Sequence, residues 1–511
     1  MMELNIVWFR RDLRVHDHAA LAAAAAAGGR LVPLYIFDPR YWHRPDTSAR
    51  QFDFLVESLA DLDRALRQRG SELCLRSGTP TEVLSRLHAQ HGIASLHFHS
   101  RNGTESAEDR NVRTWALKAG VPLREHAMDL PPARPDFDWH DAWEQRMRHP
   151  RLPAPDSLPP LSLKSEDWPM ASDFGLTEQD CPGRQTGGRT NAILLLRKFL
   201  AGAGRNAAKS NLSIMARDAA ASHLSAHLAV GSVSEREVWQ GAMKARSALL
   251  ADGDETFASA LSAFCEKLAL RARIHQSASR AGTTPATALP EDTHGRAGAA
   301  VPDARLMAWA NGGTGFPLLD ASMRCLIATG QLDGRLRSLL LSFATCHLWL
   351  APEQPGRHMA QLCTDFEPDM FYGNARAVIG ISHDMPAYIP NPVRQSLARD
   401  PDGAFIRKWV PELAGLPDPY LHCPWEAPKS VLSAHGIVLG QSYPMRLVDH
   451  VAAAREARRR LAPRPASRPL PFNKATPRSP VGGARAGRRN LPAHGHRAGP
   501  VQLSFDLQVP A

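Results

Sequence analysis

The stretch that decides the fold covers residues 312–350 and reads GGTGFPLLDASMRCLIATGQLDGRLRSLLLSFATCHLWL. Apolar residues recur in it at helical spacing, first over 318–326 and again over 336–343. Each of these two predicted helices therefore has an apolar face wide enough to be buried. A third helix is expected after a Pro-containing turn, and it carries HMAQLCTDFE at 358–367.

Charged residues interrupt these apolar helices. Arg335 and Arg337 begin the second predicted helix, and Asp365 is placed on the third. A charged side chain among apolar ones is costly unless it pairs with an opposite charge or with a ligand. Two interpretations stay open from these residues alone: a structural ion pair, or a pair that also serves a ligand site.

Several blocks of sequence, in a fixed order, resemble the photolyase/cryptochrome family. The run TGFPLLDASMR…RLRSLLLSF…D, followed by NPVRQ…DPDGAFIRKWVPEL, is similar to that family's flavin-binding half. The opening IVWFRRDLRVHDHAAL is similar to the family's N-terminal start, so the matches cover most of residues 4–426. The resemblance implies an α/β N-terminal domain with a Rossmann-like parallel sheet, joined to an all-α C-terminal domain that binds FAD.

The N-terminal part supports this fold class independently. Residues 4–128 alternate short apolar runs with amphipathic helices, a pattern typical of a parallel sheet covered on both faces. Thr79-Pro80-Thr81-Glu82 predicts a capped helix start after a strand. No GxGxxG or GxxxxGK[ST] occurs, so the residues give no sign of a phosphate-binding loop. The expected strands are Asn5–Phe9, Leu31–Phe37, Glu72–Leu75 and Ser95–His99.

Composition divides the chain into four parts. Residues 1–130 form the predicted α/β antenna domain, and 131–186, rich in proline and polar residues, form an interdomain connector. Residues 187–461 form the helical FAD-binding domain, and 462–511 form a basic Pro/Arg-rich tail that we expect to be disordered. Within the helical domain we expect helices at Asn191–Leu200, Ala219–Val230, Glu235–Leu250 and Phe257–Ala278, a loop over 280–302, and a last helix through Arg455–Arg460.

Bulk properties narrow the class of protein. The chain has 511 residues, of which 43% are hydrophobic, and no apolar run approaches the length needed to span a membrane. The seven cysteines are scattered without a CxxC pair, which argues against a disulfide framework and an iron–sulfur cluster. The N-terminus enters a strand without a signal-peptide pattern. We therefore expect a cytoplasmic protein, without a membrane contact and monomeric.

The net charge of +10 lies mostly in the tail. From Ala462 onward there are eight Lys or Arg residues and one acid, Asp506, so the tail carries +7 of that charge. The tail's basic residues could hold DNA non-specifically. Its apolar end, Gln502–Leu507, resembles peptides by which bacterial repair proteins dock on the replication sliding clamp, although a segment without a partner also fits.

The resemblance also implies cofactor residues. Ser222 and Ser225 match serines that hold the flavin phosphates, although ordinary helix capping explains them equally well. Arg337 and Asp365 match an Arg–Asp pair beside the isoalloxazine ring, and Glu367 replaces a nearby aspartate. These five are the predicted FAD-binding residues. The spacing of His223 and His227 suits a metal, but no third ligand is near in sequence, so we expect no metal site.

Other positions depart from the family pattern. Phe371 replaces a polar residue at the reactive flavin nitrogen, and Pro352 and Ala375 replace electron-transfer tryptophans. In the expected damage pocket, non-matching residues replace an acid, two stacking tryptophans and an asparagine. They are Lys267, Leu270, Ala377 and Gly334. Such losses would weaken the hold on a flipped lesion.

Two classes of function follow from the resemblance. One is a light-dependent deoxyribodipyrimidine photolyase that acts on UV-damaged DNA. The other is a cryptochrome-like sensor, or a scaffold with weak or lost FAD binding, that does not repair DNA. No catalytic residue can be assigned, and the second, antenna chromophore stays open. Arg10, Arg11 and Asp12 are expected to form salt bridges between the domains rather than to contact a ligand.

Overall fold

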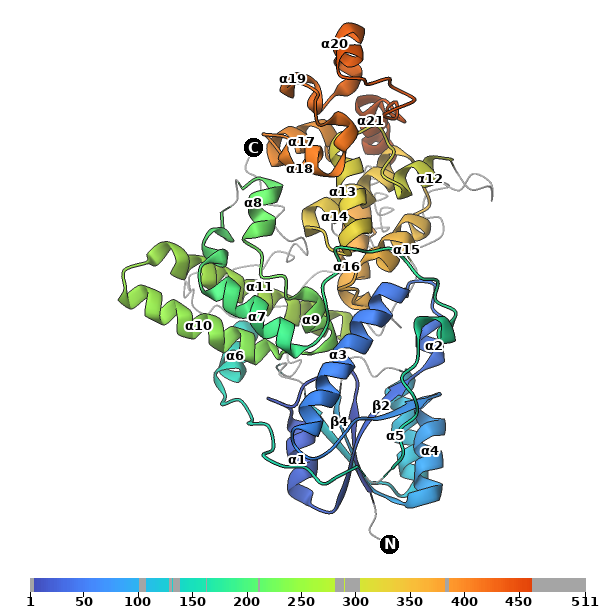
Figure 1. The fold of residues 1–511 in the computed structure, drawn as a ribbon, viewed down its shortest axis with the longest axis vertical. Coiled ribbons are helices and arrows are strands. Elements are labelled where there is room, and N and C mark those ends of the chain that lie inside the picture. The colour runs from blue at the N-terminus through green and yellow to red at the C-terminus, as the bar shows by residue number, and fades with distance from the viewer. Residues whose placement is uncertain are drawn as a thin grey trace, which may run out of the picture.

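The two parts of the chain are visible in the computed structural model (Figure 1). The sheet with its helices occupies one end, the helical part lies above it, and α17 to α21 are farthest from the sheet. The described residues are 4–100, 107–127, 131, 138–161, 163–209, 212–280, 289, 304–381 and 386–461. The predicted tail at 462–511 and nearly all of the predicted loop at 280–302 lie outside them.

Five parallel strands form the sheet in the order β3-β2-β1-β4-β5. Every residue of the central strand β1 is buried, because helices cover both faces of the sheet. The α/β fold class is confirmed, but the third strand begins later than predicted, and β5 was not predicted because LREHA offers no apolar run. The strands are β1 Leu4–Phe9, β2 Arg30–Phe37, β3 Cys74–Ser77, β4 Ile93–Ser100 and β5 Leu123–Ala127.

Helices connect the strands. The capped start predicted at Thr79 is present, with Pro80 at the first position of α4 and a reciprocal bond between Thr79 and Glu82. The nearly all-alanine helix α1 packs against β1, β2, β4 and β5. These helices are α1 Ala19–Ala27, α2 Pro39–Trp42, α3 Ala49–Arg67, α4 Pro80–His91 and α5 Ala107–Ala119.

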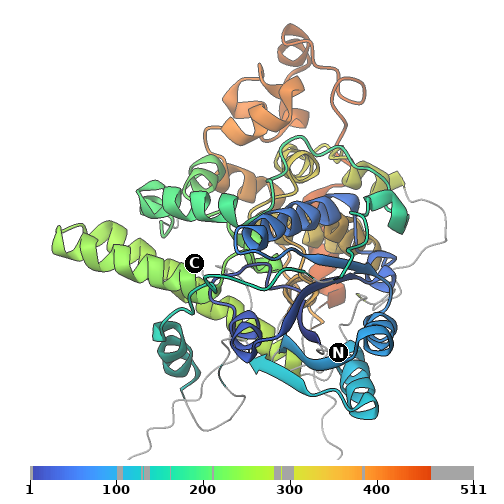
Figure 2. The same ribbon diagram turned by 60° about the horizontal axis from the view of Figure 1, so that its bottom comes forward.

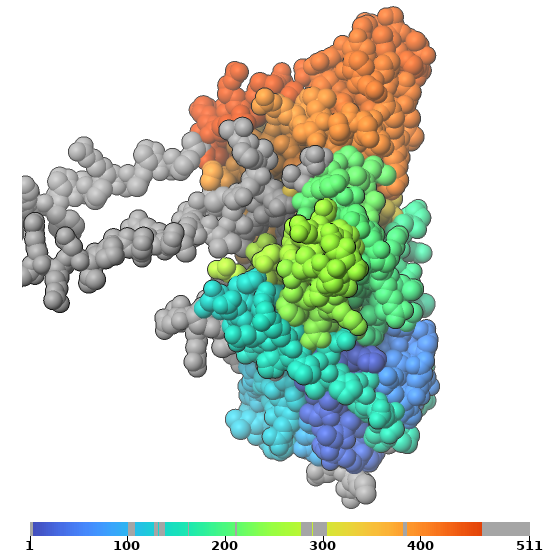
Figure 3. Space-filling view, turned by 90° about the vertical axis from the view of Figure 1, so that its left-hand side faces the viewer, coloured from blue at the N-terminus to red at the C-terminus, as the bar shows by residue number. Residues whose placement is uncertain are grey.

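The predicted connector contains structure of its own. Asp138 caps a helix, α6 (Trp139–Arg148), which the proline-rich composition around it concealed. Figure 3 shows α6 packed beside the α10–α11 hairpin, above the α/β domain. Farther along, Leu158 and Glu166 donate backbone hydrogen bonds to the α/β domain, and Gly183 donates one to Ala328 of the helical domain. The connector is therefore hydrogen-bonded to both domains.

The helical domain is built on the segment quoted first. Apolar residues of α13 and α14 are buried in one core, and the second helix passes into a π-helical turn over Phe343–His347. The helices predicted at 191–200, 235–250 and 257–278 are present, and each extends beyond its predicted bounds by one or a few residues. The bounds are α7 Arg189–Leu200, α8 Ile214–Ala219, α9 Ser225–Val230, α10 Glu235–Ala251, α11 Glu255–Arg280, α12 Ala304–Ala310, α13 Pro317–Thr329, α14 Gly334–Ser342, α15 Glu353–Leu362, α16 Pro368–Ile379, α17 Pro392–Arg399, α18 Ala404–Trp409, α19 Asp418–Leu421, α20 Lys429–Ala434 and α21 His450–Leu461.

Helix α3 carries the main contact between the domains, and Figure 2 shows it lying against the helical part. The buried guanidinium of Arg50 donates to the carbonyl oxygens of Leu326, Ile327 and Leu362 at 3.3, 3.0 and 3.2 Å. These carbonyls belong to the last turns of α13 and α15, where backbone carbonyls run short of intrahelical partners, although Leu326 O also accepts from the N–H of Gly330. Arg50 therefore closes two helix ends and joins the domains at once.

The expected salt bridges at the start of the chain form differently. Arg10 pairs with Asp109 and Asp12 pairs with His99, so both remain within the α/β domain. Of the three, only Arg11 reaches the interface: burial alone would lower its pKa, but Tyr41 and then Glu367 of the helical domain raise it above its ordinary value. Two residues that the prediction did not include, Arg14 and Asp17, also bridge the domains. They contact Gly231, Ser234 and Arg236.

In the described parts of the chain, no helix combines the length and the apolarity needed to cross a membrane.

Candidate functional site

A cavity of about 1070 Å³ lies inside the helical domain. Its wall comes from the segment before α9, one face of α11, the start of α14, the turn after α15 and the helix α16. All five predicted FAD-binding residues line it: Ser222, Ser225, Arg337, Asp365 and Glu367. Residues separated by more than a hundred positions in the sequence therefore meet at one site, as the prediction requires.

Arg337 and Asp365 form an ion pair in the wall. Their nearest atoms, Arg337 Nη1 and Asp365 Oδ1, are 2.9 Å apart, and Arg337 Nη2 donates to Asp365 Oδ2 at 3.1 Å. Burial alone would lower the pKa of Arg337, but Asp365 outweighs it and holds that pKa above its ordinary value. Asp365 lies in the turn after α15 and not on that helix, which corrects the prediction. The pair is a fixed, charged element of the cavity wall.

Glu367 belongs to a second set of buried charges. Arg271 bridges it to Glu235, and His275 Nε2 lies 3.1 Å from its other oxygen. Burial would raise the pKa of Glu367, but Arg271 and His275 hold it well below its usual range. Burial raises the pKa of Glu235. Arg271, Glu235 and His275 were not predicted from the sequence, although Arg271 and His275 are four residues apart on one face of α11.

The two serines lie where the chain enters α9. Ser222 is in the segment between α8 and α9, and Ser225 is the first residue of α9. The predicted single helix over Ala219–Val230 is wrong, because residues 220–224 separate two short helices. Leu224 occupies the cap position of α9 without a side-chain bond, so the capping interpretation of the serines does not hold there. Their hydroxyls remain available to a ligand in the cavity.

The two histidines of this segment, His223 and His227, lie in different surroundings. His223 has a positive φ of 54° and contacts the carbonyl of Asp218 and the side chain of Gln331. His227 is fully buried, its ring lies beside Phe54, and burial lowers its pKa to about 4. The histidines therefore serve separate packing roles. The nitrogen Nε2 of Gln331 is buried in the cavity wall without a hydrogen-bond partner.

Among the described residues, one group has the composition of a metal site: Asp12, His18 and His99. His18 Nδ1 accepts a hydrogen bond from the backbone N–H of Leu21 at 3.0 Å, so the ring carries its proton on Nε2. That nitrogen lies 3.0 Å from Asp12 Oδ2 and faces it as a donor. Because a metal needs the lone pair of that nitrogen, the group is a hydrogen-bonded core element.

Most of the positions that depart from the family pattern lie in the cavity wall. Lys267, Gly334, Ala375 and Ala377 line the cavity, and we call these four the bare wall. Phe371 lines it as well. Among the described residues, Leu270 and Pro352 do not line the cavity, so the damage-pocket position expected for Leu270 is corrected. Three of the four bare-wall residues have almost no side chain to stack on a base.

The residues present fit FAD. The cavity is larger than one planar ring requires, since ligand pockets commonly measure about 300–1,000 Å³. It offers one fixed ion pair, one ionised carboxylate, two hydroxyls and the unpartnered donor of Gln331. Apolar rings, among them Phe199, Phe366 and Phe405, complete the wall. A ligand with a polar-edged ring and a charged, hydrogen-bonding chain matches this set.

Comparison with known proteins assigns the same role to these regions. Residues 264–463 match the family described as the FAD binding domain of DNA photolyase, and residues 5–130 match the family described as DNA photolyase. A cryptochrome DASH of Gloeobacter violaceus is 32% identical over 88% of this chain and 95% of its own length. A deoxyribodipyrimidine photo-lyase of Agrobacterium fabrum is 30% identical over 88% of this chain and 96% of its own.

Solved structures agree on the fold. A bacterial class III photolyase from Agrobacterium tumefaciens superposes with a TM-score of 0.75 and 26% identity, covering 90% of this chain and 97% of that one. A cryptochrome from Synechocystis superposes with a TM-score of 0.77 and 23% identity, covering 90% and 99%. At 23% identity the second likeness concerns the fold alone. Repair enzymes and cryptochromes are thus both among the similar proteins.

Proposed function

This chain belongs to the photolyase/cryptochrome family, and from that premise we propose that it is an FAD-binding, light-responsive flavoprotein of low repair activity. The observation that supports the proposal best is the Arg337–Asp365 pair in the wall of a cavity with the volume and polarity for FAD. When bound, FAD would supply blue-light absorption and one-electron chemistry. Ser222, Ser225, Arg337, Asp365 and Glu367 would hold it.

Different residues of the cavity would bind different parts of FAD. Arg337 and Asp365 fix each other, so the pair can meet a polar ring edge without reorganising. Arg271 and His275 keep Glu367 ionised, and it can therefore only accept hydrogen bonds. The hydroxyls of Ser222 and Ser225 can donate to phosphate oxygens. The same residues need no change of protonation to do so near neutral pH.

The bare wall is the reason to propose low repair activity. A flipped pyrimidine dimer must offset the cost of unstacking by new stacking and hydrogen bonds. Ala377 stands at a stacking position and offers little surface, Gly334 has no side chain for hydrogen bonding, and Lys267 places a cation in the same wall. A stacking aromatic contributes about 1–3 kcal/mol per base, so the loss of such platforms would weaken lesion binding substantially.

A DNA photolyase acting on UV-damaged DNA is the second candidate. The photo-lyase of Agrobacterium fabrum, at 30% identity, favours it. The same family includes proteins named cryptochromes at 29–32% identity, which favour a sensor. The distinction therefore depends on the cavity, and there the bare wall favours the non-repairing alternative.

Titration with FAD tests the proposal. The purified protein, stripped of any ligand, is expected to bind FAD with quenching of flavin fluorescence and a structured blue absorption band. Protein that takes up no FAD in such a titration would overturn the proposal. FAD-loaded protein, supplied with reductant and blue light, is then given an oligonucleotide with a pyrimidine dimer. Splitting at the rate of an ordinary photolyase would favour the second candidate.

A further inference from the structure

We propose that Tyr372 is the side chain that gives an electron to a photoexcited flavin in this protein, with Asp46 as the acceptor of its phenolic proton. The inference rests on the proposed function, because it requires FAD in the cavity. It assigns an electron source to a chain in which Pro352 and Ala375 stand at the positions of the family's electron-transfer tryptophans.

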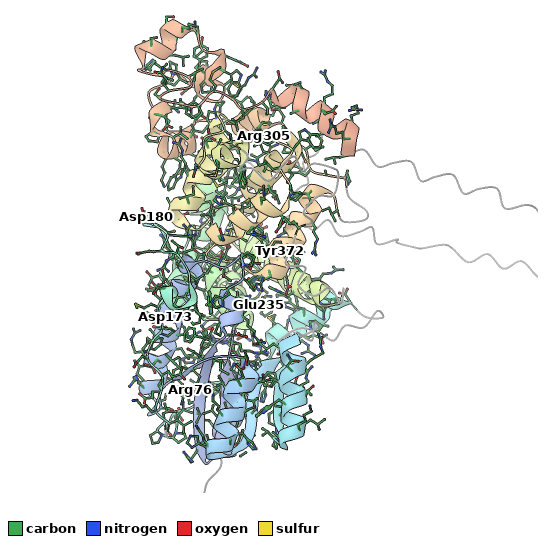
Figure 4. The ribbon with its side chains drawn as sticks, turned by 90° about the vertical axis from the view of Figure 1, so that its right-hand side faces the viewer. Arg76, Asp173, Asp180, Glu235, Arg305 and Tyr372 are labelled. Atoms are coloured by element: carbon green, nitrogen blue, oxygen red, sulfur yellow. The ribbon has the colours of Figure 1, made fainter. Side chains whose placement is uncertain are left out.

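Tyr372 and Asp46 form a hydrogen-bonded pair across the domain boundary. The phenolic Oη of Tyr372 on α16 donates to Asp46 Oδ2 at 3.0 Å, and Asp46 precedes α3 in the α/β domain. Tyr372 is 5% exposed and Asp46 is 2% exposed, so water does not compete for the bond. Figure 4 shows Tyr372 where the helical part meets the α/β domain. Arg44 binds both carboxylate oxygens: its Nε donates to Oδ1 at 3.0 Å, and its Nη2 lies 2.7 Å from Oδ2, the oxygen that also accepts from Tyr372.

Aromatic rings connect this pair to the cavity. The ring of Tyr372 lies 5.3 Å from that of Phe371 and 6.0 Å from that of Phe366, measured between centroids. Both phenylalanines line the cavity, and their rings are 5.5 Å apart. Tyr372 is therefore one ring removed from the cavity, in van der Waals contact with its wall. An electron can tunnel over such a distance through packed side chains.

Two other oxidisable rings line the cavity, and their surroundings make them poorer donors. The ammonium of Lys408 lies 5.1 Å from the centroid of the Trp409 ring, and a cation there opposes the positive charge of an oxidised indole. Tyr388 faces the guanidinium of Arg399, a donor that cannot accept a phenolic proton. Of the tyrosines and tryptophans described near the cavity, Tyr372 is the one hydrogen-bonded to a carboxylate.

The step conserves charge and atoms. With FAD bound, the light-excited cofactor would supply the one-electron oxidant, and Tyr372 would lose one electron to it as the phenolic O–H bond breaks. The proton moves along the existing hydrogen bond to Asp46 Oδ2, where a carboxyl O–H forms. Tyr372 becomes a neutral radical. An external thiolate can later return one electron and become a thiyl radical; the proton on Asp46 then moves back to the phenol oxygen, which restores both Tyr372 and the Asp46 carboxylate.

The charges around the pair favour coupling of the two transfers. Burial and the neighbouring carboxylate of Asp46 both raise the pKa of Tyr372, so the phenol keeps its proton until an electron leaves. The ion pair with Arg44 fixes the position of the Asp46 carboxylate that receives the proton. Loss of the electron makes the phenol strongly acidic, and the bond to Asp46 then offers an immediate acceptor.

Irradiation of FAD-loaded protein tests the inference by electron paramagnetic resonance. We expect a neutral tyrosyl signal, which should change shape when the protein contains ring-deuterated tyrosine. Tyr372→Phe should lose the signal, and Asp46→Asn should lose it or form it more slowly. Without added thiol, flavin photoreduction should be slower in Tyr372→Phe and in Asp46→Asn than in the unaltered protein. For the unaltered protein it should be slower in D₂O than in H₂O.

Tyr388→Phe and Trp409→Phe are the matched controls, and both should retain the tyrosyl signal. FAD titration of every variant comes first, because it separates failure of binding from failure of electron donation. Protein that takes up no FAD would overturn the proposed function and this inference with it. Normal FAD binding with an unchanged radical in Tyr372→Phe, or with a radical lost only in Trp409→Phe, would overturn this inference alone.

Discussion

Two sets of residues in the wall of one cavity, the cofactor set and the bare wall, differ in how their side chains are supported. In the cofactor set, Arg337 pairs with Asp365, and Glu367 pairs with Arg271 and His275. In the bare wall, Gly334, Ala375 and Ala377 have almost no side chain, and Lys267 stands at a position where the family has an acid. The difference teaches that a cavity can keep the charge pairs suited to a cofactor while losing the surfaces suited to a base.

The largest effect is expected from Arg337→Ala, which disrupts the cofactor set. Removing one partner of a buried ion pair leaves the other charge unpaired, and this typically costs about 3–5 kcal/mol. We expect FAD binding to be lost and the denaturation midpoint to fall. Arg40→Ala is the control, because Arg40 pairs with Asp38 at the surface and its side chain is 57% exposed. A surface pair contributes about 0–1 kcal/mol. Equal FAD affinity in Arg337→Ala and the unaltered protein would contradict this comparison.

A pH effect is expected from His227, which supports α9 behind Ser225. Burial lowers its pKa to about 4, below the ordinary value of about 6.5. The folded state therefore binds fewer protons than the unfolded state between these values, and stability should fall as pH drops from about 6.5 toward 4. The total change from this residue is roughly 3 kcal/mol.

His227→Phe should flatten that part of the stability curve, because the new ring lies beside Phe54 and cannot titrate. Urea denaturation from pH 4.5 to 7 measures it. His435→Gln, at an exposed position, should leave the curve unchanged. A curve for His227→Phe with the same slope as the unaltered protein would show that other groups carry the effect.

The role of the bare wall in lesion binding can be tested by restoring one aromatic ring. Ala377→Trp should strengthen binding of a dimer-containing oligonucleotide by about 5- to 150-fold, the equivalent of about 1–3 kcal/mol per stacked base. FAD affinity should stay the same, since Ala377 is not among the five residues proposed to hold FAD. Fluorescence anisotropy measures both. Ala434→Trp, on the exposed face of α20, is the control. Unchanged dimer affinity in Ala377→Trp would show that the wall does not face a lesion.

The smallest effect on the cavity is expected from the tail. Deleting 462–511 should weaken retention of undamaged DNA strongly at low salt and little at high salt, because phosphate contacts by Lys and Arg are screened. FAD titration should be the same in both proteins. If the full chain and the shortened protein retain DNA equally at every salt concentration, the tail does not contribute to DNA binding. A pull-down with the sliding clamp tests Gln502–Leu507 separately.

The sequence was sufficient for the fold because its signals were local. Apolar spacing located α13 and α14, the Thr79 motif located α4, and ordered family blocks joined the two domains. Signals failed where structure depends on tertiary contacts. The strand β5 is polar by composition, and α6 lies within a proline-rich segment.

The sequence predicted the ion pair of the site but not the residues that hold Glu367. Arg337 and Asp365 could be matched to a known pair, and the structure brings them together. Arg271 and His275 could not, since their role depends on Glu367 approaching from a distant helix start. The bond between Tyr372 and Asp46 has no local sequence signal at all, because its partners come from different domains.

The three carbonyl contacts of Arg50 also set an order of events during synthesis of the chain. The sheet is complete once Ala127 has left the ribosome, whereas the last carbonyl that Arg50 binds belongs to Leu362. At about 5–20 residues per second, the α/β domain waits on the order of tens of seconds for that partner. During this interval the Arg50 guanidinium and the interface side of α3 are exposed to other nascent chains. Newly made α/β domain is therefore the stage at which chaperones would contribute most to the yield of this protein.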